Sequence, residues 1–272
     1  MERTVSLAAG LPAVCRLGLA TRGNTHLKRE DVEHAVGRGI NYLNWCGHPD
    51  GLSRAVARLG DVRRRVVVAA QFQSRSAADA KAEFASMLDQ LRTDYVDVLT
   101  LYYVESQEEW DAITAPSGAW EYLAEQKHCG RLRMIGLTSH QRAPAAEWAK
   151  SGKLDLLMIR YNAAHRGAEH DVFPITQRLH IPVVTFTGLR WKALLNPTPE
   201  DPPGFRPPSA PECYRFCLAN PAVGVALMAP GNRRELEQDL TLLDEWRAPD
   251  AGELDVMRAH GERVRRHAGI FW

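Results

Sequence analysis

Residues 39–72 read GINYLNWCGHPDGLSRAVARLGDVRRRVVVAAQF. Two short apolar runs, INYLNW and VVVAAQF, are joined by a segment from Leu52 to Leu59 that has helical character and ends at Gly60. The runs are rich in apolar residues and do not alternate cleanly with polar ones, which is typical of parallel strands covered by helices. The stretch therefore predicts a strand–helix–strand unit with a right-handed crossover.

The same unit repeats along the chain. The apolar runs are CRLGLAT (15–21), INYLNW (40–45), VVVAAQF (66–72), VDVLTLYY (96–103), RMIGLTS (133–139), LLMIRYN (156–162), PVVTFTG (182–188) and VGVALMA (223–229). The expected helices are Lys28–Arg38, Leu52–Leu59, Ala77–Leu91, Ala119–Lys127, Ala143–Lys150, Val172–Leu179, Pro211–Leu218 and Arg233–Leu243, with Thr25 as a cap for the first. Eight repeats favour closure into a (β/α)8 TIM barrel, which typically takes about 250 residues. We expect residues 1–272 to form one such domain.

The rival architecture is an open, doubly wound sheet. Such a sheet usually has a Gly-rich turn after its first strand, and LATRGNTH (19–26) is not G-x-G-x-x-G. Two elements extend the predicted barrel: a hairpin at its base from about Thr4 to Val14, and a helix from about Ala251 to His267 on its outside. Pro12 and Arg16 argue against a signal peptide at SLAAGLPAV (6–14), so we expect a cytoplasmic protein.

The composition narrows the range of partners. Hydrophobic content of 45%, charged content of 25% and a net charge of +1 give no electrostatic reason to expect nucleic acid or a membrane surface. No apolar run approaches the ~18 residues that span a bilayer. The five scattered cysteines predict reduced thiols, and no zinc-like spacing predicts a metal site. We expect Arg63, Arg64 and Arg65 to lie in a solvated loop.

Four segments carry a resemblance to the aldo-keto reductase family. GINYLNWCGHPDGLSRAV resembles the family's Asp-Thr-Ala and Tyr-Gly region, RLRMIGLTSH its Ile-Gly-Val-Ser-Asn strand, MIRYNAAHRGAEHDVFP its Gln-x-x-Tyr-Asn strand, and MAPGNRRELEQDL its Ile-Pro-Gly helix start. The resemblance covers roughly residues 13 to 243. It implies the barrel fold and an NADP(H)-dependent oxidoreductase that acts on a small carbonyl or alcohol substrate.

The resemblance also implies where the catalytic residues lie, and there the chain departs from the family. The family's Asp falls on Asn44, its Lys on Gln71 and its His on Tyr102, while its Tyr falls on Pro49, beside His48. We expect Asn44 and Gln71 to form an amide pair in place of the family's ion pair. His48 is the predicted proton donor, because histidine is the side chain that titrates near neutral pH. Tyr102 is expected to line the pocket.

For the cofactor, the resemblance implies NADPH. The residues that would bind it are Ser139, His140, Thr187, Gly231, Asn232, Arg233 and Arg234. A helix start such as Gly231–Asn232 suits a phosphate through its free N–H groups and dipole, and Arg233 and Arg234 could add charge-assisted bonds. The alternative is a plain helix start with solvated arginines.

Further polar residues follow the last strands. Arg160 would favour an anionic substrate if its register points it inward, and Arg190 and Trp191 could add to this effect. Tyr161 loosely resembles the family's nicotinamide-stacking aromatic residue. The Pro-rich stretch from Leu195 to Pro211, which contains NPTPEDPPGFRPPSA, is either a lid over the pocket or a passive surface loop.

Two functions remain open at this point. The first is the NADP(H)-dependent oxidoreductase with a rebuilt proton donor, acting on a small and possibly anionic molecule. The second is a non-redox barrel, either a lyase or isomerase or a ligand-binding protein, that retains the scaffold. The phosphate-binding helix start favours the first, and the altered catalytic positions favour the second.

Overall fold

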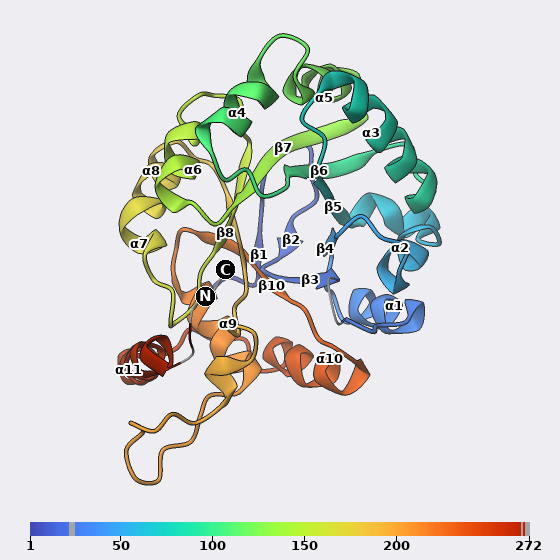
Figure 1. Ribbon diagram of the computed structural model, residues 1–272. Coiled ribbons are helices and arrows are strands. Elements are labelled where there is room, and N and C mark those ends of the chain that lie inside the picture. The colour runs from blue at the N-terminus through green and yellow to red at the C-terminus, as the bar shows by residue number, and fades with distance from the viewer. Residues whose placement is uncertain (22–24, 268, 270–272) are drawn as a thin grey trace.

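The computed structural model describes residues 1–21, 25–267 and 269. Within these ranges, eight parallel strands close into a barrel in the order β10-β3-β4-β5-β6-β7-β8-β9 (Figure 1). The strands are β3 (Leu17–Thr21), β4 (Tyr42–Trp45), β5 (Val67–Phe72), β6 (Val96–Leu101), β7 (Leu132–Ser139), β8 (Leu156–Arg160), β9 (Val183–Phe186) and β10 (Val223–Met228). β10 pairs with β3, Ala226 opposite Leu17, and this pairing closes the ring. The predicted barrel is confirmed and the open sheet is excluded.

Helices surround the barrel (Figure 1). They are α1 (Arg29–Gly37), α2 (Gly51–Val56), α3 (Ala77–Leu91), α4 (Gln107–Thr114), α5 (Ala119–His128), α6 (Arg142–Ala149), α7 (Ala168–Asp171), α8 (Phe173–Arg178), α9 (Ala210–Ala219), α10 (Arg233–Leu240) and α11 (Ala251–His267). The first begins at Arg29, one residue after the predicted start. Its N-cap is Lys28, whose N–H donates to the Asp31 carboxylate (2.8 Å), and not Thr25. The predicted sixth helix, Val172–Leu179, corresponds to α8, and the short α7 before it was not predicted.

Helix α4 was not predicted from the sequence. Its N-cap, Ser106, accepts the N–H of Glu109 (3.2 Å), so the helix start is well formed. Only Trp110 and Ile113 are buried in it. Two apolar residues one turn apart give too short a periodic pattern to distinguish a helix from a loop.

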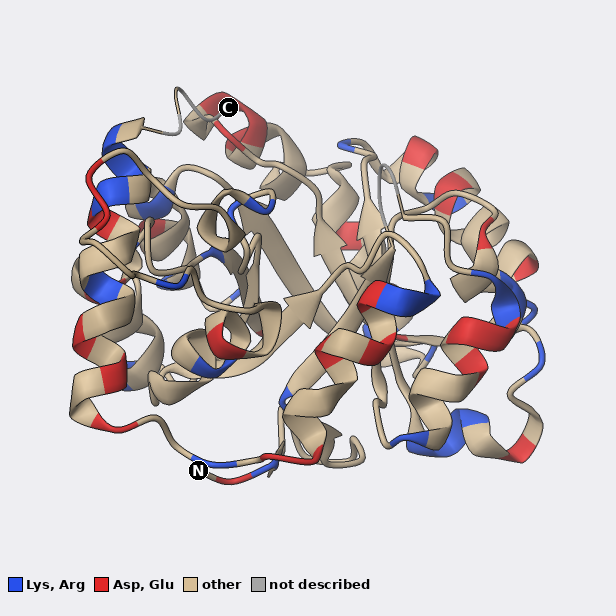
Figure 2. Ribbon diagram, turned by 90° about the horizontal axis from the view of Figure 1, so that it is seen from below, with Lys and Arg blue, Asp and Glu red and all other residues tan. Residues whose placement is uncertain are grey.

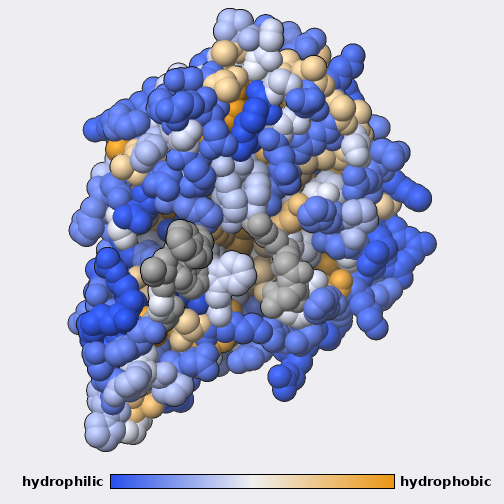
Figure 3. Space-filling view, in the orientation of Figure 1, coloured by the Kyte–Doolittle hydropathy of each residue, from blue (hydrophilic) through white to orange (hydrophobic). Residues whose placement is uncertain are grey.

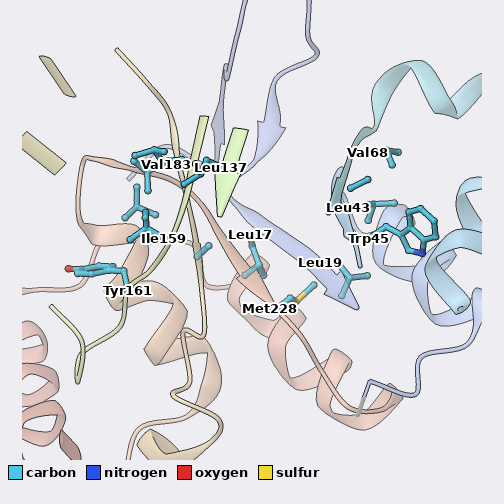
Figure 4. Packing of buried hydrophobic residues seen from close by; sticks show 14 of the residues in the cluster. Leu17, Leu19, Leu43, Trp45, Val68, Leu137, Ile159, Tyr161, Val183 and Met228 are labelled. Atoms are coloured by element: carbon cyan, nitrogen blue, oxygen red, sulfur yellow. The ribbon is translucent and has the colours of Figure 1, made fainter. Parts of the chain in front are cut away.

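The core has two layers separated by the barrel wall. The interior cluster is Leu7, Val14, Ala20, Tyr42, Val67, Ala69, Val98, Met134, Leu156, Met158, Val184, Val225 and Leu227. The outer layer packs between strands and helices, and Figure 4 shows part of it, including Leu17, Leu43 and Trp45. Because successive strand side chains point to opposite faces, these two sets fix which residues face inward.

The base of the barrel is closed by the predicted hairpin, in which β1 (Thr4–Val5) pairs antiparallel with β2 (Val14–Cys15). Of the three arginines before β5, Arg64 and Arg65 are exposed as expected, but Arg63 is buried. Gly60–Arg65 is a 3₁₀ helix, and Arg63 is 9% exposed. The Nη1 of Arg63 donates to Asp97 Oδ2 (2.8 Å), and this hydrogen bond explains why the side chain is buried.

The predicted C-terminal helix α11 packs on the outside of the barrel. A Cβ on its Gly261 would lie 2.1 Å from the carbonyl oxygen of Ala163, so the helix approaches the loop after β8 closely. Arg263 of α11 pairs with Asp201 of the Pro-rich stretch (2.6 Å). In Figure 1 the Pro-rich stretch extends beyond α9 and α11, away from the barrel centre. It is therefore not a lid over the mouth.

The surface carries mixed charge, and Figure 2 shows acidic and basic residues interspersed on the outer helices. The face seen in Figure 3 is largely hydrophilic, with hydrophobic residues in small separate patches. None of the described helices combines the length and the apolar character needed to cross a membrane.

Candidate active site

A ring of inward-facing side chains lies at the carboxyl ends of the strands. Tyr42, Ala69 and Met158 belong to the interior cluster, and residues an even number of positions further along each strand face the same way. This alternation defines the mouth ring: Asn44, Gln71, Tyr102, Thr138, Arg160 and Phe186. The carboxyl end of the strands is where parallel barrels place their active sites. Three predicted catalytic residues, Asn44, Gln71 and Tyr102, therefore come together there.

Asn44 is the most unusual member of the ring. Its side chain is 1% exposed, and neither Nδ2 nor Oδ1 has a hydrogen-bond partner among the described residues. The expected amide pair with Gln71 is therefore not formed. The register explains this: Asn44 lies opposite Ala69, whereas Gln71 lies one inward layer higher, opposite Thr100. A buried polar group without a partner is rare, and a ligand or water satisfies it in most proteins.

Thr138 is a second such residue, and the sequence analysis missed it. Its Oγ1 is buried and has no hydrogen-bond partner within the described chain. The residue that was predicted, Ser139, is fully buried, and its Oγ accepts the N–H of Gln141 (2.9 Å). By alternation from Met134, Thr138 faces the barrel interior and Ser139 does not. Counting that alternation would have identified Thr138.

Aromatic side chains form one wall of the mouth. The Tyr102 and Tyr103 rings stack with centroids 3.9 Å apart, and the Tyr103 and His140 centroids are 4.2 Å apart. Phe186 meets His140 edge to face at 5.8 Å. The Glu105 carboxylate accepts the backbone N–H of His140 (2.9 Å), and its Oε1 lies 3.3 Å from Nδ1 of the His140 imidazole. Tyr103 has a φ of 45°, a left-handed conformation that a bulky residue adopts only under constraint.

The neighbouring part of the mouth, after β8 and β9, is cationic. Arg160 lies two residues after the inward-facing Met158, so its side chain also faces the barrel interior. Burial lowers the pKa of Arg160. Arg190 is 1% exposed and donates from Nη1 to Nε2 of His165. Burial, followed by the charges of Arg190 and Arg160, lowers the pKa of His165 to about 4. This side of the mouth therefore combines two guanidinium groups with a neutral imidazole.

The loop after β9 is tied to the loop after β8 through Asn162. The amide Nδ2 of Asn162 donates to the carbonyl of Thr187 (2.8 Å), and its Oδ1 accepts the N–H groups of Ala164 and His165. Thr187 has a φ of 59°, and Arg190, Trp191 and Lys192 are also left-handed. Such strain is often found at binding loops. The predicted cofactor residue Thr187 directly follows β9 and so lies at the mouth.

The start of α10 is partly occupied by its own side chains. The N–H of Gly231 donates to Glu235 Oε2 (2.8 Å), and the Asn232 side chain accepts the N–H of Glu235 (3.1 Å). Arg233 pairs with Asp31 (3.2 Å) and Glu237 (2.6 Å).

Arg234 is exposed beside them. Because the Arg233 guanidinium is already held by two carboxylates, Arg234 is the better placed of the two for a phosphate.

His48 and Tyr161 also lie outside the mouth ring. His48 is exposed in the loop after β4, where its carbonyl accepts the indole N–H of Trp45 (2.7 Å). Tyr161 lies in the outer layer (Figure 4), and its hydroxyl donates to Glu169 (2.7 Å). Burial raises the pKa of Tyr161. The suggestion that Tyr161 stacks on a nicotinamide is therefore wrong, because its ring faces away from the barrel interior.

A closed parallel barrel with polar side chains at its carboxyl ends has the architecture of TIM-barrel enzymes. The model of the aldo/keto reductase family matches residues 16–209, and the chain belongs to this family. The fold resembles aldo-keto reductase AKR11C1 from Bacillus halodurans (holo form), with a TM-score of 0.77, 19% identity and 96% of each chain covered.

Two structures of a Klebsiella pneumoniae aldo-keto reductase are also similar in fold. One is a complex with NADP and acetate (18% identity, TM-score 0.73) and the other a complex with NADPH (17% identity, TM-score 0.73), each covering 92% of both chains. Comparison with curated proteins gives no match.

Proposed function

We propose that the protein is an NADP(H)-dependent oxidoreductase that interconverts a small carbonyl compound and its alcohol. Family membership supports the class of reaction, and the Klebsiella pneumoniae relatives hold NADP or NADPH. The observation that carries the proposal is the buried, unpartnered amide of Asn44 in the mouth ring. It supplies a hydrogen-bond donor and an acceptor where a reacting carbonyl would enter.

The residues at the mouth fit the cofactor. Asn44 and Thr138 both have buried polar atoms without partners among the described residues, so a polar ligand that reaches this depth satisfies them. The left-handed loop at Thr187 and the exposed Arg234 at the start of α10 would bind the nucleotide phosphates. When bound, NADPH supplies the hydride.

The chain's own residues then determine the proton chemistry. At the positions where the resemblance expects Asp, Lys and His, this chain has Asn44, Gln71 and Tyr102. Asn44 Nδ2 would donate to the carbonyl oxygen and stabilise the developing alkoxide. A neutral Gln71 does not activate a phenol by charge, so Tyr102 lines the site and His48, at its rim, donates the proton. Because the phenol of Tyr102 lacks an activating cation, we expect simple aldehydes to be reduced ~10²–10⁴ more slowly than by a charge-activated acid.

The substrate is proposed to be anionic. Arg160 and Arg190 face a neutral His165 at the cationic side of the mouth, and burial lowers the pKa of both arginines. An anionic group on the substrate would compensate these clustered charges through charge-assisted hydrogen bonds. A small keto acid combines such a group with a reducible carbonyl.

The test is a fluorescence titration with NADPH and NADH, followed by single-turnover reduction of a keto acid and of the corresponding uncharged aldehyde. We expect tighter binding of NADPH, and reduction of the keto acid faster than that of the aldehyde. Equal, millimolar affinity for both nucleotides would overturn the proposal. It would favour a non-redox barrel instead, a reading supported by the neutral amides Asn44 and Gln71 in the mouth ring.

A further inference from the structure

A cavity lies outside the barrel, between α9, α11 and the Pro-rich stretch. Its volume is about 200 Å³. The walls are largely apolar and include Phe205, Phe216, Leu254 and Met257. Figure 1 shows α9 and α11 on the outer ring of helices, so the cavity is separate from the mouth ring.

One cation is buried in this wall. Arg215 of α9 lines the cavity and is 5% exposed. Its Nη2 donates to the backbone carbonyl of Glu245 (3.1 Å), and the Glu245 carboxylate lies 3.9 Å away on an exposed side chain. The Nε of Arg215 is buried and has no hydrogen-bond partner among the described residues. A buried guanidinium with so little compensation is costly, and a bound anion would remove that cost.

The nearby carboxylates are already engaged by other groups. Glu212 pairs with Arg206 (2.7 Å) and accepts the N–H of Ser209 (2.6 Å). Glu253 pairs with Arg247 and accepts the N–H of Asp250 (2.8 Å). Among the described residues neither carboxylate hydrogen-bonds to Arg215, although its charge adds to the Arg247 hydrogen bond in lowering the pKa of Glu253. The guanidinium therefore has hydrogen-bonding capacity left for a ligand.

We propose that this cavity binds a small monocarboxylate with an apolar body. The carboxylate would bind the guanidinium of Arg215, whose planar donors match its two oxygens. The apolar body would pack against Phe216, Leu254 and Met257. The volume is below the ~300–1,000 Å³ typical of drug-sized ligands, so a short chain such as hexanoate fits better than a long one. The proposal does not depend on the reaction at the barrel mouth.

The test is an NMR titration of the ¹⁵N-labelled full chain with hexanoate. We expect saturable shifts in amides of α9 and α11. Hexan-1-ol, which lacks the charge, and acetate, which lacks the apolar body, should bind at least about tenfold more weakly. Arg215→Gln should weaken hexanoate by a similar factor. Arg160→Gln, at the mouth, should leave these shifts unchanged, so binding at the proposed active site is distinguished from binding here.

A second variant covers the case in which Arg215→Gln does not fold. Leu254→Trp keeps the guanidinium and fills the cavity, so it should abolish the shifts. Arg206→Gln is the matched control, because Arg206 also lines the cavity but is paired with Glu212. No saturable shift in α9 or α11, hexan-1-ol binding as tightly as hexanoate, or binding that persists in Leu254→Trp would each overturn the proposal.

Discussion

Arg190 donates from Nη1 to Nε2 of His165 at the cationic side of the barrel mouth. A guanidinium has no acceptor, so Nε2 of His165 is the acceptor and the imidazole carries its proton on Nδ1. Burial and the charges of Arg190 and Arg160 together lower the pKa of His165 to about 4. The imidazole therefore stays neutral at physiological pH.

The first prediction concerns stability in acid. Because the pKa of His165 is lower in the folded protein than in the unfolded chain, the unfolded chain binds more protons between about pH 6.5 and pH 4. The free energy of unfolding should fall across that window as the pH is lowered. In His165→Gln this part of the fall should be absent, as measured by urea denaturation at neutral pH and at about pH 5. Parallel pH profiles for the two proteins would contradict it.

The second prediction concerns Asn44. Asn44→Leu removes two buried polar atoms that lack partners, so it should raise the free energy of unfolding by about 1–3 kcal/mol. The same change should remove binding at the mouth, as measured by NADPH titration and turnover. Thr138→Val is the matched control, since it deletes the other unpartnered group with little change of shape. A destabilised Asn44→Leu would mean that ordered water already satisfies the amide.

The third prediction concerns the base of the barrel. Asp97 is 2% exposed, accepts from Arg63 (2.8 Å) and from the N–H of Val68 (2.9 Å), and lies 3.4 Å from Arg133. Arg63→Met should cost about 3–5 kcal/mol, because it leaves a buried carboxylate poorly compensated. Adding Asp97→Asn should recover part of that loss in a double-mutant cycle of chemical denaturation. Strictly additive effects would show that the two side chains act independently.

The fourth prediction concerns nucleotide preference. Arg234→Ala should weaken NADPH by about tenfold and leave NADH nearly unchanged, as measured by fluorescence titration. Arg233→Ala should have the smaller effect on NADPH, because its guanidinium is held by Asp31 and Glu237. Its main effect should be a loss of stability, since Asp31 lies on α1. The reverse order of the two variants would show that Arg233 exchanges its partners for the phosphate.

The fifth prediction concerns the proton donor. His48→Ala should remove most turnover of the preferred carbonyl substrate, by ~10²-fold or more, whereas Tyr102→Phe should retain it. Rapid reduction by His48→Ala, together with inactivity of Tyr102→Phe, would assign the proton transfer to the phenol in the mouth ring.

Local patterns were sufficient to predict most of the fold. The strand order, the base hairpin and α11 follow from apolar periodicity and Gly stops, and Ala77–Leu91 has the predicted bounds. The burial of Arg63 was not predictable in this way, because its partner Asp97 lies on another strand. The position of the Pro-rich stretch depends likewise on Arg263, far along the chain.

The site was predictable only in part. Asn44, Gln71 and Tyr102 were assigned to strand ends from the sequence. The alternation of strand residues beginning at Met158 would have predicted that Arg160 faces inward. Ser139 was named through the family resemblance and stays a prediction, whereas Thr138, one residue earlier, faces the interior because alternate strand residues face opposite sides. The missing partners of Asn44 had no signal in the sequence, because they depend on how far neighbouring strands are staggered.

The hairpin at the base has a consequence for traffic through the molecule. Leu7 and Val14 pack into the interior cluster, so within the described residues the floor of the barrel is filled and the mouth ring lies at the other end. A cofactor and a substrate that both enter through the mouth have to bind in order. Whichever sits deeper has to arrive first and leave last, and the release of the deeper one would then set the pace of each cycle.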